Sequence, residues 1–256
     1  TTLGFAYGGT YWAGHIATLR TYARGLTAAE VKQNFLAQAY RYLATDVPSI
    51  AGIKAWYRAD AGTSTTTDAA SVTTWNDQSG NGYNLSQAGA ARPTYGANCM
   101  NGRPCLRFNQ TQYMNTGAML GITGDAPLTV FAVCTTVAPS QVQRLFSLGA
   151  SNTTGTMIGY RSHGNFASTI PYGNQANYGI FTTGVVPRLT LITLTKTTGP
   201  VNTSVTLRRN GVADTTPATP TDTLNLTNSI LRVGAYTDDT VQAWKGAISE
   251  FILFDQ

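Results

Sequence analysis

The chain has 256 residues, 42% of them hydrophobic and only 11% charged, so it can bury a core but must cover its surface mainly with Thr, Ser, Asn, Gln and Gly. Such a surface is typical of extracellular or particle-exposed β proteins more than of cytosolic enzymes. The net charge is +5, but the arginines are scattered along the chain and form no basic stripe, which disfavours nucleic-acid binding. No apolar run approaches the roughly 18 residues that span a bilayer, which disfavours membrane insertion.

The N-terminal region carries a motif that the chain repeats near its end. Gly4-Phe5-Ala6-Tyr7, followed by Trp12-Ala13-Gly14-His15-Ile16, is similar to Gly234-Ala235-Tyr236 followed by Trp244-Lys245-Gly246-Ala247-Ile248. In each copy a glycine and a tyrosine mark the end of a strand, a loop follows, and Trp-x-Gly-x-Ile opens a second strand. After the first copy comes the only convincing helix.

This helix begins at a capping box, Thr27-Ala28-Ala29-Glu30, and is predicted over residues 27–43. Four apolar residues follow at helical spacing: Val31, Phe35, Ala39 and Tyr42. We therefore interpret residues 1–45 as the closing strands and terminal helix of a preceding or partner sandwich, and residues 46–256 as a second, nearly whole one.

Two strands and a helix bury too little apolar surface to fold alone. Residues 1–45 must therefore pack on the main domain in cis, on a missing upstream domain, or on a neighbouring chain. Addition of a strand to an exposed sheet edge would serve the last two cases. We expect neighbouring protein subunits as partners of these N-terminal strands.

The remainder reads as short strands separated by turn residues. The predicted strands include residues 128–134, 189–194, 204–208, 230–233 and 248–254. Asn101-Gly102 and Asn210-Gly211 are signals for type I′ hairpins. Cys99 and Cys105 flank the first of these turns, so they either form a disulfide between neighbouring strands or are two small buried side chains.

Three strings between residues 53 and 108 carry a family resemblance. They are Ala55-Trp56-Tyr57-Arg58-Ala59-Asp60, Trp75-Asn76-Asp77-Gln78-Ser79-Gly80-Asn81-Gly82 and Asn101-Gly102-Arg103-Pro104. In this order they resemble the laminin-G-like, concanavalin A-like jelly rolls found in bacterial surface proteins and in phage and virus particles. We therefore expect an all-β fold, a two-sheet antiparallel jelly-roll β-sandwich with one short N-terminal helix.

The resemblance leaves the function open, because the family includes lectin-like binders, adhesive modules, structural particle proteins and glycanases. Its glucanases place acidic residues two and four apart on one strand face. This chain has only two glutamates, Glu30 and Glu250, and neither has an acidic neighbour at that spacing. His15 and His163 lie in no metal-ligand or nucleophile motif. We predict no catalytic residue, and that the chain is not an enzyme.

Two binding sites are candidates. Asp77, Ser79 and Asn81 present oxygens at alternate positions, as calcium loops do, but the same side chains could make turns with their own backbone. Calcium is the one cofactor considered. Residues 157–182 hold ring and polar side chains that would suit a shallow sugar site, the alternative being an ordinary loop packed by its own tyrosines. The ligand-binding candidates are Tyr160, Arg161, His163, Tyr172, Asn174 and Tyr178.

These observations predict a non-catalytic structural or adhesive module on an extracellular or virion surface. We expect it to bind a neighbouring protein or a surface glycan. One alternative is a carbohydrate-binding module excised from a larger surface protein, and a second is a glycan hydrolase.

Overall fold

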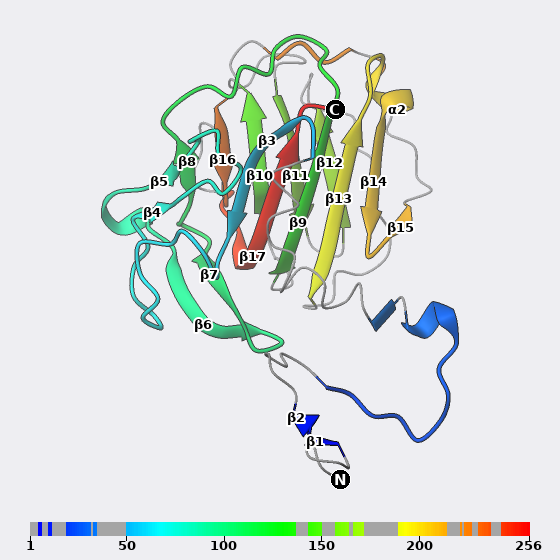
Figure 1. Ribbon diagram of the computed structural model, residues 1–256. Coiled ribbons are helices and arrows are strands. Elements are labelled where there is room, and N and C mark those ends of the chain that lie inside the picture. Colours follow the sequence, from blue (N-terminus) through cyan, green and yellow to red (C-terminus); the bar gives the residue numbers. More distant parts are fainter. Residues whose placement is uncertain are drawn as a thin grey trace. The chain divides into compact units, whose positions relative to one another are not determined.

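A computed structural model describes residues 5–6, 10–11, 19–31, 33–34, 50–136, 143–149, 157–163, 166–171, 189–213, 221, 223–226, 230–236 and 242–256 (Figure 1). The chain divides into two compact units, residues 1–46 and 47–256. This boundary lies one residue from the predicted one. The interpretation of the first unit as the end of another sandwich stays a prediction.

The second unit contains two sheets that face each other (Figure 1). The seven-stranded sheet has the order β12 (Phe166–Pro171), β11 (Met157–His163), β10 (Gln143–Gly149), β16 (Leu231–Val233), β8 (Met114–Thr116), β5 (Leu85–Ser86) and β4 (Thr74–Trp75). The eight-stranded sheet has the order β15 (Val212–Ala213), β14 (Val205–Arg209), β13 (Thr190–Lys196), β9 (Leu128–Thr136), β17 (Lys245–Phe254), β7 (Arg103–Asn109) and β6 (Thr94–Met100), with β3 (Ile53–Arg58) also paired to β17.

Helices are short in this unit: the described residues hold a 3-10 turn at Gly89–Ala91 and α2 at Val201–Ser204. Every named strand pair in the described residues is antiparallel. The predicted fold class, all-β with two antiparallel sheets packed as a sandwich, is confirmed.

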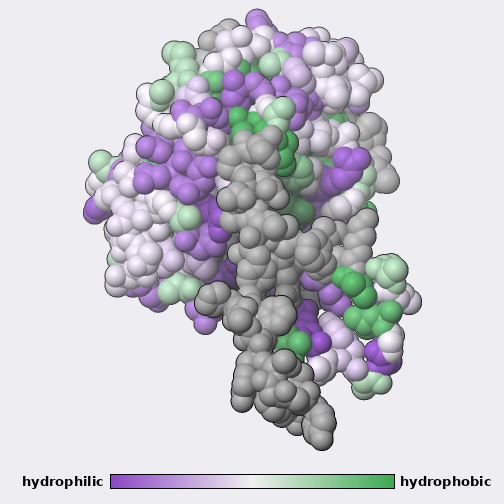
Figure 2. All heavy atoms as spheres, viewed as in Figure 1, coloured by the Kyte–Doolittle hydropathy of each residue, from purple (hydrophilic) through white to green (hydrophobic). Residues whose placement is uncertain are grey.

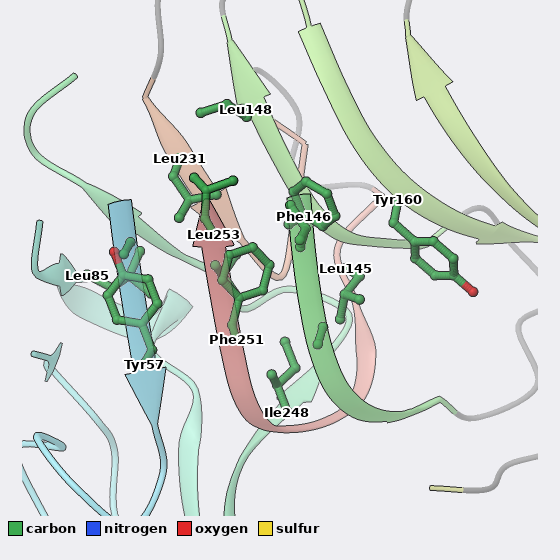
Figure 3. Close-up of a cluster of buried hydrophobic side chains, with 14 of the residues drawn as sticks. Tyr57, Leu85, Leu145, Phe146, Leu148, Tyr160, Leu231, Ile248, Phe251 and Leu253 are labelled. Atoms are coloured by element: carbon green, nitrogen blue, oxygen red, sulfur yellow. The ribbon is translucent and has the colours of Figure 1, made fainter. Parts of the chain in front are cut away.

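The strands are rich in β-branched and aromatic residues, and several of them alternate in burial along the chain. In β9 every second residue from Leu128 to Thr136 is buried, and its neighbours face outward. The inward residues of both sheets meet in one core, where the Phe251 ring lies 5.3 Å from that of Phe146 and 6.3 Å from that of Tyr57. Figure 3 shows these side chains converging from β3, β10 and β17.

Both predicted hairpins are present. Asn101 and Gly102 have φ of 50° and 78° and connect β6 to β7. Asn210 and Gly211 have φ of 51° and 83° and connect β14 to β15, so each pair has the two positive φ angles of a type I′ turn. Across the first turn, Cys99 and Cys105 form a disulfide with a Cα–Cα distance of 6.0 Å. The disulfide alternative is thus the one the structure contains.

The first unit, described by itself, holds the two-residue strands β1 (Phe5–Ala6) and β2 (Thr10–Tyr11), which pair with each other. The capping box is formed: the Glu30 amide donates to Thr27 Oγ1 at 3.3 Å, and the Thr27 amide donates to Glu30 Oε2 at 2.9 Å. Residues 28–31 are helical. The predicted helix beyond residue 34 and the predicted strand at residues 12–18 lie outside the described residues.

The described surface of the second unit is mostly neutral or hydrophilic in the view of Figure 2, with smaller hydrophobic groups. This agrees with a chain that is rich in Thr and Gly and poor in charge. Among the helices that the structure describes, none has the length and apolar character needed to cross a membrane.

Candidate functional site

The predicted sugar loop is partly strand, because Tyr160, Arg161 and His163 belong to β11. Tyr160 is only 3% exposed, and its ring packs against that of Trp244 with centroids 6.4 Å apart. Burial raises the pKa of its hydroxyl above the usual value. Ile158 and Tyr160 both belong to the buried core, as alternate residues of one strand do, and a ligand contact at Tyr160 stays a prediction.

Arg161 and His163 belong to the same strand, and Arg161 pairs with Arg144 of β10. Tyr172 and Asn174, together with Tyr178, lie outside the described residues. A sugar site that includes these residues stays a prediction.

Hydrogen bonds already engage the oxygens of the predicted calcium loop. Asp77 Oδ1 accepts from the amides of Trp56 and Ser79, each at 2.9 Å. Asp77 Oδ2 accepts from the Ser79 hydroxyl at 2.8 Å and from the Tyr83 amide at 3.1 Å. The carboxylate therefore links the loop to the middle of β3, as the turn alternative expects.

The amide of Asn81 makes a second link, because its Nδ2 donates to the carbonyls of Ile53 at 2.9 Å and Lys54 at 3.1 Å. Gly80 and Gly82 supply the positive φ angles, 91° and 79°. A search of the described residues finds no group of three or more His, Cys, Asp or Glu that could hold a metal ion. Calcium binding at this loop stays a prediction to be tested.

A different polar group lies on the outer face of the eight-stranded sheet; we call it the carboxyl cluster and define it as Trp56, Arg58, Asp60, Arg103 and Glu250. Its frame is the pairing of β3 with β17, which places Arg58 directly opposite Glu250. Trp56 Nε1 donates to Glu250 Oε1 at 2.8 Å. The Arg58 guanidinium lies 5.2 Å from the centroid of the Trp56 ring.

The same guanidinium binds the second carboxyl of the cluster. Arg58 Nε and Nη2 donate to Asp60 Oδ1 and Oδ2, both at 2.9 Å, which is the two-pronged geometry that suits an arginine fork. Asp60 is exposed and the Arg58 side chain is partly buried. Glu250 and Asp60 therefore both lie next to Arg58, and Glu250 is half-buried whereas Asp60 is exposed.

Burial raises the pKa of Glu250, and the negative charge of Asp60 raises it further. The Trp56 hydrogen bond and the charges of Arg58 and Arg103 lower this pKa, but the net shift is upward. The Glu250 carboxyl thus holds its proton more tightly than an ordinary glutamate. A carboxyl of this kind beside an ion-paired carboxylate supplies one proton donor and one negative charge.

Sequence reasoning missed this cluster because it looked for acidic residues two and four apart on one strand. The carboxyl groups of Asp60 and Glu250 are instead far apart in the sequence, and the pairing of β3 with β17 brings them to the same region. One signal was available: Trp56, Arg58 and Asp60 stand at alternate positions in the string Ala55-Trp56-Tyr57-Arg58-Ala59-Asp60, as residues on one face of a strand do. Glu250 likewise interrupts an apolar strand.

Comparison with solved structures finds similar folds. Trypanosoma rangeli sialidase in complex with sialic acid matches with a TM-score of 0.55 and 11% identity, over 89% of this chain and 37% of that one. Domain 4 of AbnA, a GH43 extracellular arabinanase from Geobacillus stearothermophilus in complex with arabinotriose, matches with a TM-score of 0.53 and 14% identity, over 79% of this chain and 92% of that one.

An arabinofuranosidase complexed with arabinofuranosyl-α-1,2-xylobiose also matches, with a TM-score of 0.52 and 14% identity, over 73% of this chain and 47% of that one. The chain spans only 31% to 37% of the length of the first sialidases it matches. No family model matches the chain, and no curated protein does.

These neighbours bear on two predictions. The β-sandwich is shown, whereas membership of the laminin-G-like or concanavalin A-like families is not confirmed. The prediction that the chain is not an enzyme is contradicted, because the similar structures are sialidases, an arabinanase and an arabinofuranosidase, all glycoside hydrolases. At 11% to 14% identity the likeness itself is one of fold.

Proposed function

We propose that residues 47–256 form a carbohydrate-interacting domain of a glycoside hydrolase that acts outside the cell. The observation that carries this proposal is the carboxyl cluster, in which the half-buried Glu250 carboxyl accepts from Trp56 and stands opposite Arg58, whose guanidinium is ion-paired with Asp60. The neighbours support it, since they include an arabinanase described as extracellular and a sialidase bound to sialic acid.

The cluster provides the groups that sugars require. Guanidinium N–H groups of Arg58 and Arg103 donate to sugar hydroxyls, and carboxylate oxygens of Asp60 accept from them. Cleavage of a glycosidic bond needs two carboxyl groups, one that protonates the leaving oxygen and one that remains ionised on the other side of the bond. With its raised pKa, Glu250 suits the first role and Asp60 the second.

The test is a screen of the purified chain against arabinan fragments and sialylated oligosaccharides, reading binding by calorimetry and bond cleavage by release of reducing sugar. The variants are Glu250→Gln, which keeps an acceptor for Trp56 but cannot donate a carboxyl proton, and Asp60→Asn. Asp68→Asn is the matched control, because Asp68 is an exposed carboxylate that pairs with Arg107, outside the cluster.

We expect both cluster variants to lose sugar binding or cleavage and the control to retain both. Loss of cleavage with binding intact in Glu250→Gln would assign Glu250 as the proton donor. The proposal is overturned if no sugar binds the chain, or if both cluster variants bind and cleave as well as the control does.

A second function is favoured by the first unit, where Leu19, Tyr22 and Val31 are 61%, 46% and 54% exposed. We infer that this unit docks on a neighbouring protein in a structural or adhesive assembly at an extracellular or particle surface. Light scattering tests it: the intact chain should exceed its monomer mass of 27.2 kDa, and deletion of residues 1–46 should restore the monomer. A monomeric intact chain would overturn this second function.

A further inference from the structure

An irregularity in β17 determines where the Glu250 side chain lies. The pairing of β17 with β9 shifts in register between Ile248 and Glu250, so Ser249 forms a β-bulge. In a regular strand residues 248 and 250 would face the same way. Here Ile248 and Phe251 both belong to the core, whereas the Glu250 carboxyl meets Trp56 on the outer face. A bulge re-aims the side chain that follows it, and this one brings Glu250 to the carboxyl cluster.

Two hydrogen bonds hold the bulge at the point where β17 passes from β7 to β3. The Ser249 hydroxyl donates to the carbonyl oxygen of Pro104 in β7 at 2.8 Å. The amide of Ala59, which follows β3, donates to the carbonyl oxygen of Ser249 at 2.9 Å. β17 pairs with β7 as far as Ile248 and with β3 from Glu250 onward. The backbone at Glu250 is therefore fixed by both neighbouring strands.

The side chain of Glu250 is held by Trp56, which is itself held firmly. Trp56 is 4% exposed, its amide donates to Asp77 Oδ1 at 2.9 Å, and its carbonyl oxygen accepts from the Gln78 amide at 2.7 Å. The indole N–H donates to Glu250 Oε1 at 2.8 Å, and the Arg58 guanidinium lies 5.2 Å from the centroid of the ring. One buried ring thus contacts both a carboxyl and a guanidinium of the cluster.

The chemistry of the indole N–H limits where the proton of Glu250 can lie. An indole N–H only donates, so it needs an oxygen that accepts. A protonated carboxyl has one hydroxyl oxygen and one carbonyl oxygen, and the carbonyl oxygen is the better acceptor. We propose that Trp56 is the positioning residue of Glu250, and that its hydrogen bond to Oε1 assigns the proton of the neutral carboxyl to Oε2. The catalytic use of this proton rests on the proposed function.

The hydrogen bond gains strength during hydrolysis. The proton passes from Oε2 to the glycosidic oxygen as the bond from that oxygen to the anomeric carbon breaks, and water supplies the new hydroxyl group on this carbon. Glu250 becomes negatively charged in this step, so the bond from Trp56 becomes charge-assisted and roughly twice as strong. Trp56 therefore stabilises the developing carboxylate more than it stabilises the neutral acid.

The surroundings of Glu250 make this bond measurable through the pKa. Burial raises the pKa of Glu250, and the Trp56 hydrogen bond is the largest influence that lowers it, because it favours the ionised form. The charged groups that act on the carboxyl are Arg58 of β3, Asp60 after it and Arg103 of β7, and the residue opposite in β9 is uncharged. Removal of the indole N–H should therefore raise the pKa further.

The experiment is an NMR titration, which needs no substrate. The chain has only two glutamates, so isotope labelling of glutamate gives two side-chain carboxyl signals. Glu30 is the internal reference, because its hydrogen bonds to Arg24 hold its pKa at about 2. Indole N–H signals are followed in parallel on the same samples. The Trp56 signal is the one whose titration disappears in Glu250→Gln.

The main variant is Trp56→Phe, which keeps an aromatic ring beside Arg58 but lacks the N–H. Trp244→Phe is the matched control, because its indole N–H donates to the carbonyl oxygen of Thr135, outside the cluster. Thermal melts establish that each variant is folded. If Trp56→Phe does not fold, the indole titration of the unmodified chain decides the position of the proton.

We expect Trp56→Phe to raise the pKa of Glu250 and Trp244→Phe to leave it unchanged. In the unmodified chain the Trp56 indole signal should shift with the Glu250 titration. It should remain in the hydrogen-bonded range when Glu250 is neutral, because Oε1 accepts in both protonation states. A proton on Oε1 would instead release the indole N–H in acid.

Cleavage of arabinan fragments and sialylated oligosaccharides gives a second readout. A general acid acts while it is protonated, so the rate falls as pH rises through its pKa. Trp56→Phe should lower kcat/KM by up to about a hundredfold and move this fall to higher pH. A merely structural defect would lower the rate without moving the pH profile.

An unchanged Glu250 pKa in a folded Trp56→Phe variant, or an indole N–H that loses its hydrogen bond when Glu250 is protonated, would overturn the inference. If Glu250→Gln abolishes cleavage while Trp56→Phe keeps the rate and pH profile of the unmodified chain, the proposed function stands and this inference fails. If no sugar is cleaved, the proposed hydrolysis fails, and the NMR titrations still decide whether Trp56 positions Glu250.

Discussion

Replacing Asp77 by alanine measures how much one carboxylate contributes to the loop over residues 76–83. Its oxygens accept three backbone amides and one hydroxyl. A hydrogen bond to a charged group contributes about 1.5–3 kcal/mol, but bonds that share one acceptor do not add, so we expect Asp77→Ala to lose about 4 kcal/mol of unfolding free energy. For a unit of this size that loss lowers Tm by about 8–16 °C.

Urea denaturation followed by circular dichroism gives the free energy, and calorimetry gives Tm. Asp68→Ala is the control, because its carboxylate is exposed and its ion pair with Arg107 should contribute less than about 1 kcal/mol. A loss below about 1 kcal/mol in Asp77→Ala would refute the structural role of the carboxylate.

The unmodified chain and the Asp77→Ala variant also test whether the loop binds calcium. If Asp77 is a ligand, added calcium raises the Tm of the unmodified chain and leaves that of Asp77→Ala unchanged. Absence of both a calorimetric heat and a Tm shift in the unmodified chain would remove calcium as a cofactor.

Three further predictions concern stability. Because the pKa of Glu250 is raised on folding, the stability contributed by its neutral form is present below the ordinary glutamate pKa and lost as pH rises through the folded value. Glu250→Gln should therefore gain stability over the unmodified chain at neutral pH and lose that advantage in acid, and urea melts showing a pH-independent difference would contradict this. An added Cβ at Gly159 would lie 2.5 Å from a carbonyl oxygen of β10, so Gly159→Ala should cost about 1–3 kcal/mol, whereas Gly117→Ala, with nothing within 4 Å, should change stability by less than about 0.5 kcal/mol. Equal unfolding free energies for these two variants would show that β10 and β11 can move apart to accommodate the added methyl group. Replacing Cys99 and Cys105 by serine should cost about 2 kcal/mol, as should reduction, and a Tm that is insensitive to dithiothreitol would argue against the disulfide in solution.

Local patterns predicted the parts of the fold that depend on local forces. The apolar run at residues 128–134 predicted a strand, and these residues lie within β9, where each inward side chain contributes to the core. The two Asn-Gly pairs gave the hairpins, since few other residues tolerate two successive positive φ angles. The capping box gave the start of the helix at Thr27, where two reciprocal hydrogen bonds are formed.

The candidate site could not be predicted in the same way. Glu250 and Asp60 meet only because β17 pairs with β3 in one particular register, and no local pattern determines a register between distant strands. Tyr160 was misassigned to a loop because of the glycines around it. Gly159 is instead required by strand contact, since its neighbour in β10 approaches too closely for a side chain.

The position of β17 has a consequence for how the second unit is made. It is the last described strand in the sequence, yet it pairs with β9 on one side and with β3 and β7 on the other (Figure 1). A growing chain therefore leaves the edges of these three strands that face β17 unpaired until the ten residues of β17 have emerged. We expect this sheet to assemble only after residues 245–254 have been synthesised, and chaperones that shield exposed strand edges to raise the yield of the folded protein.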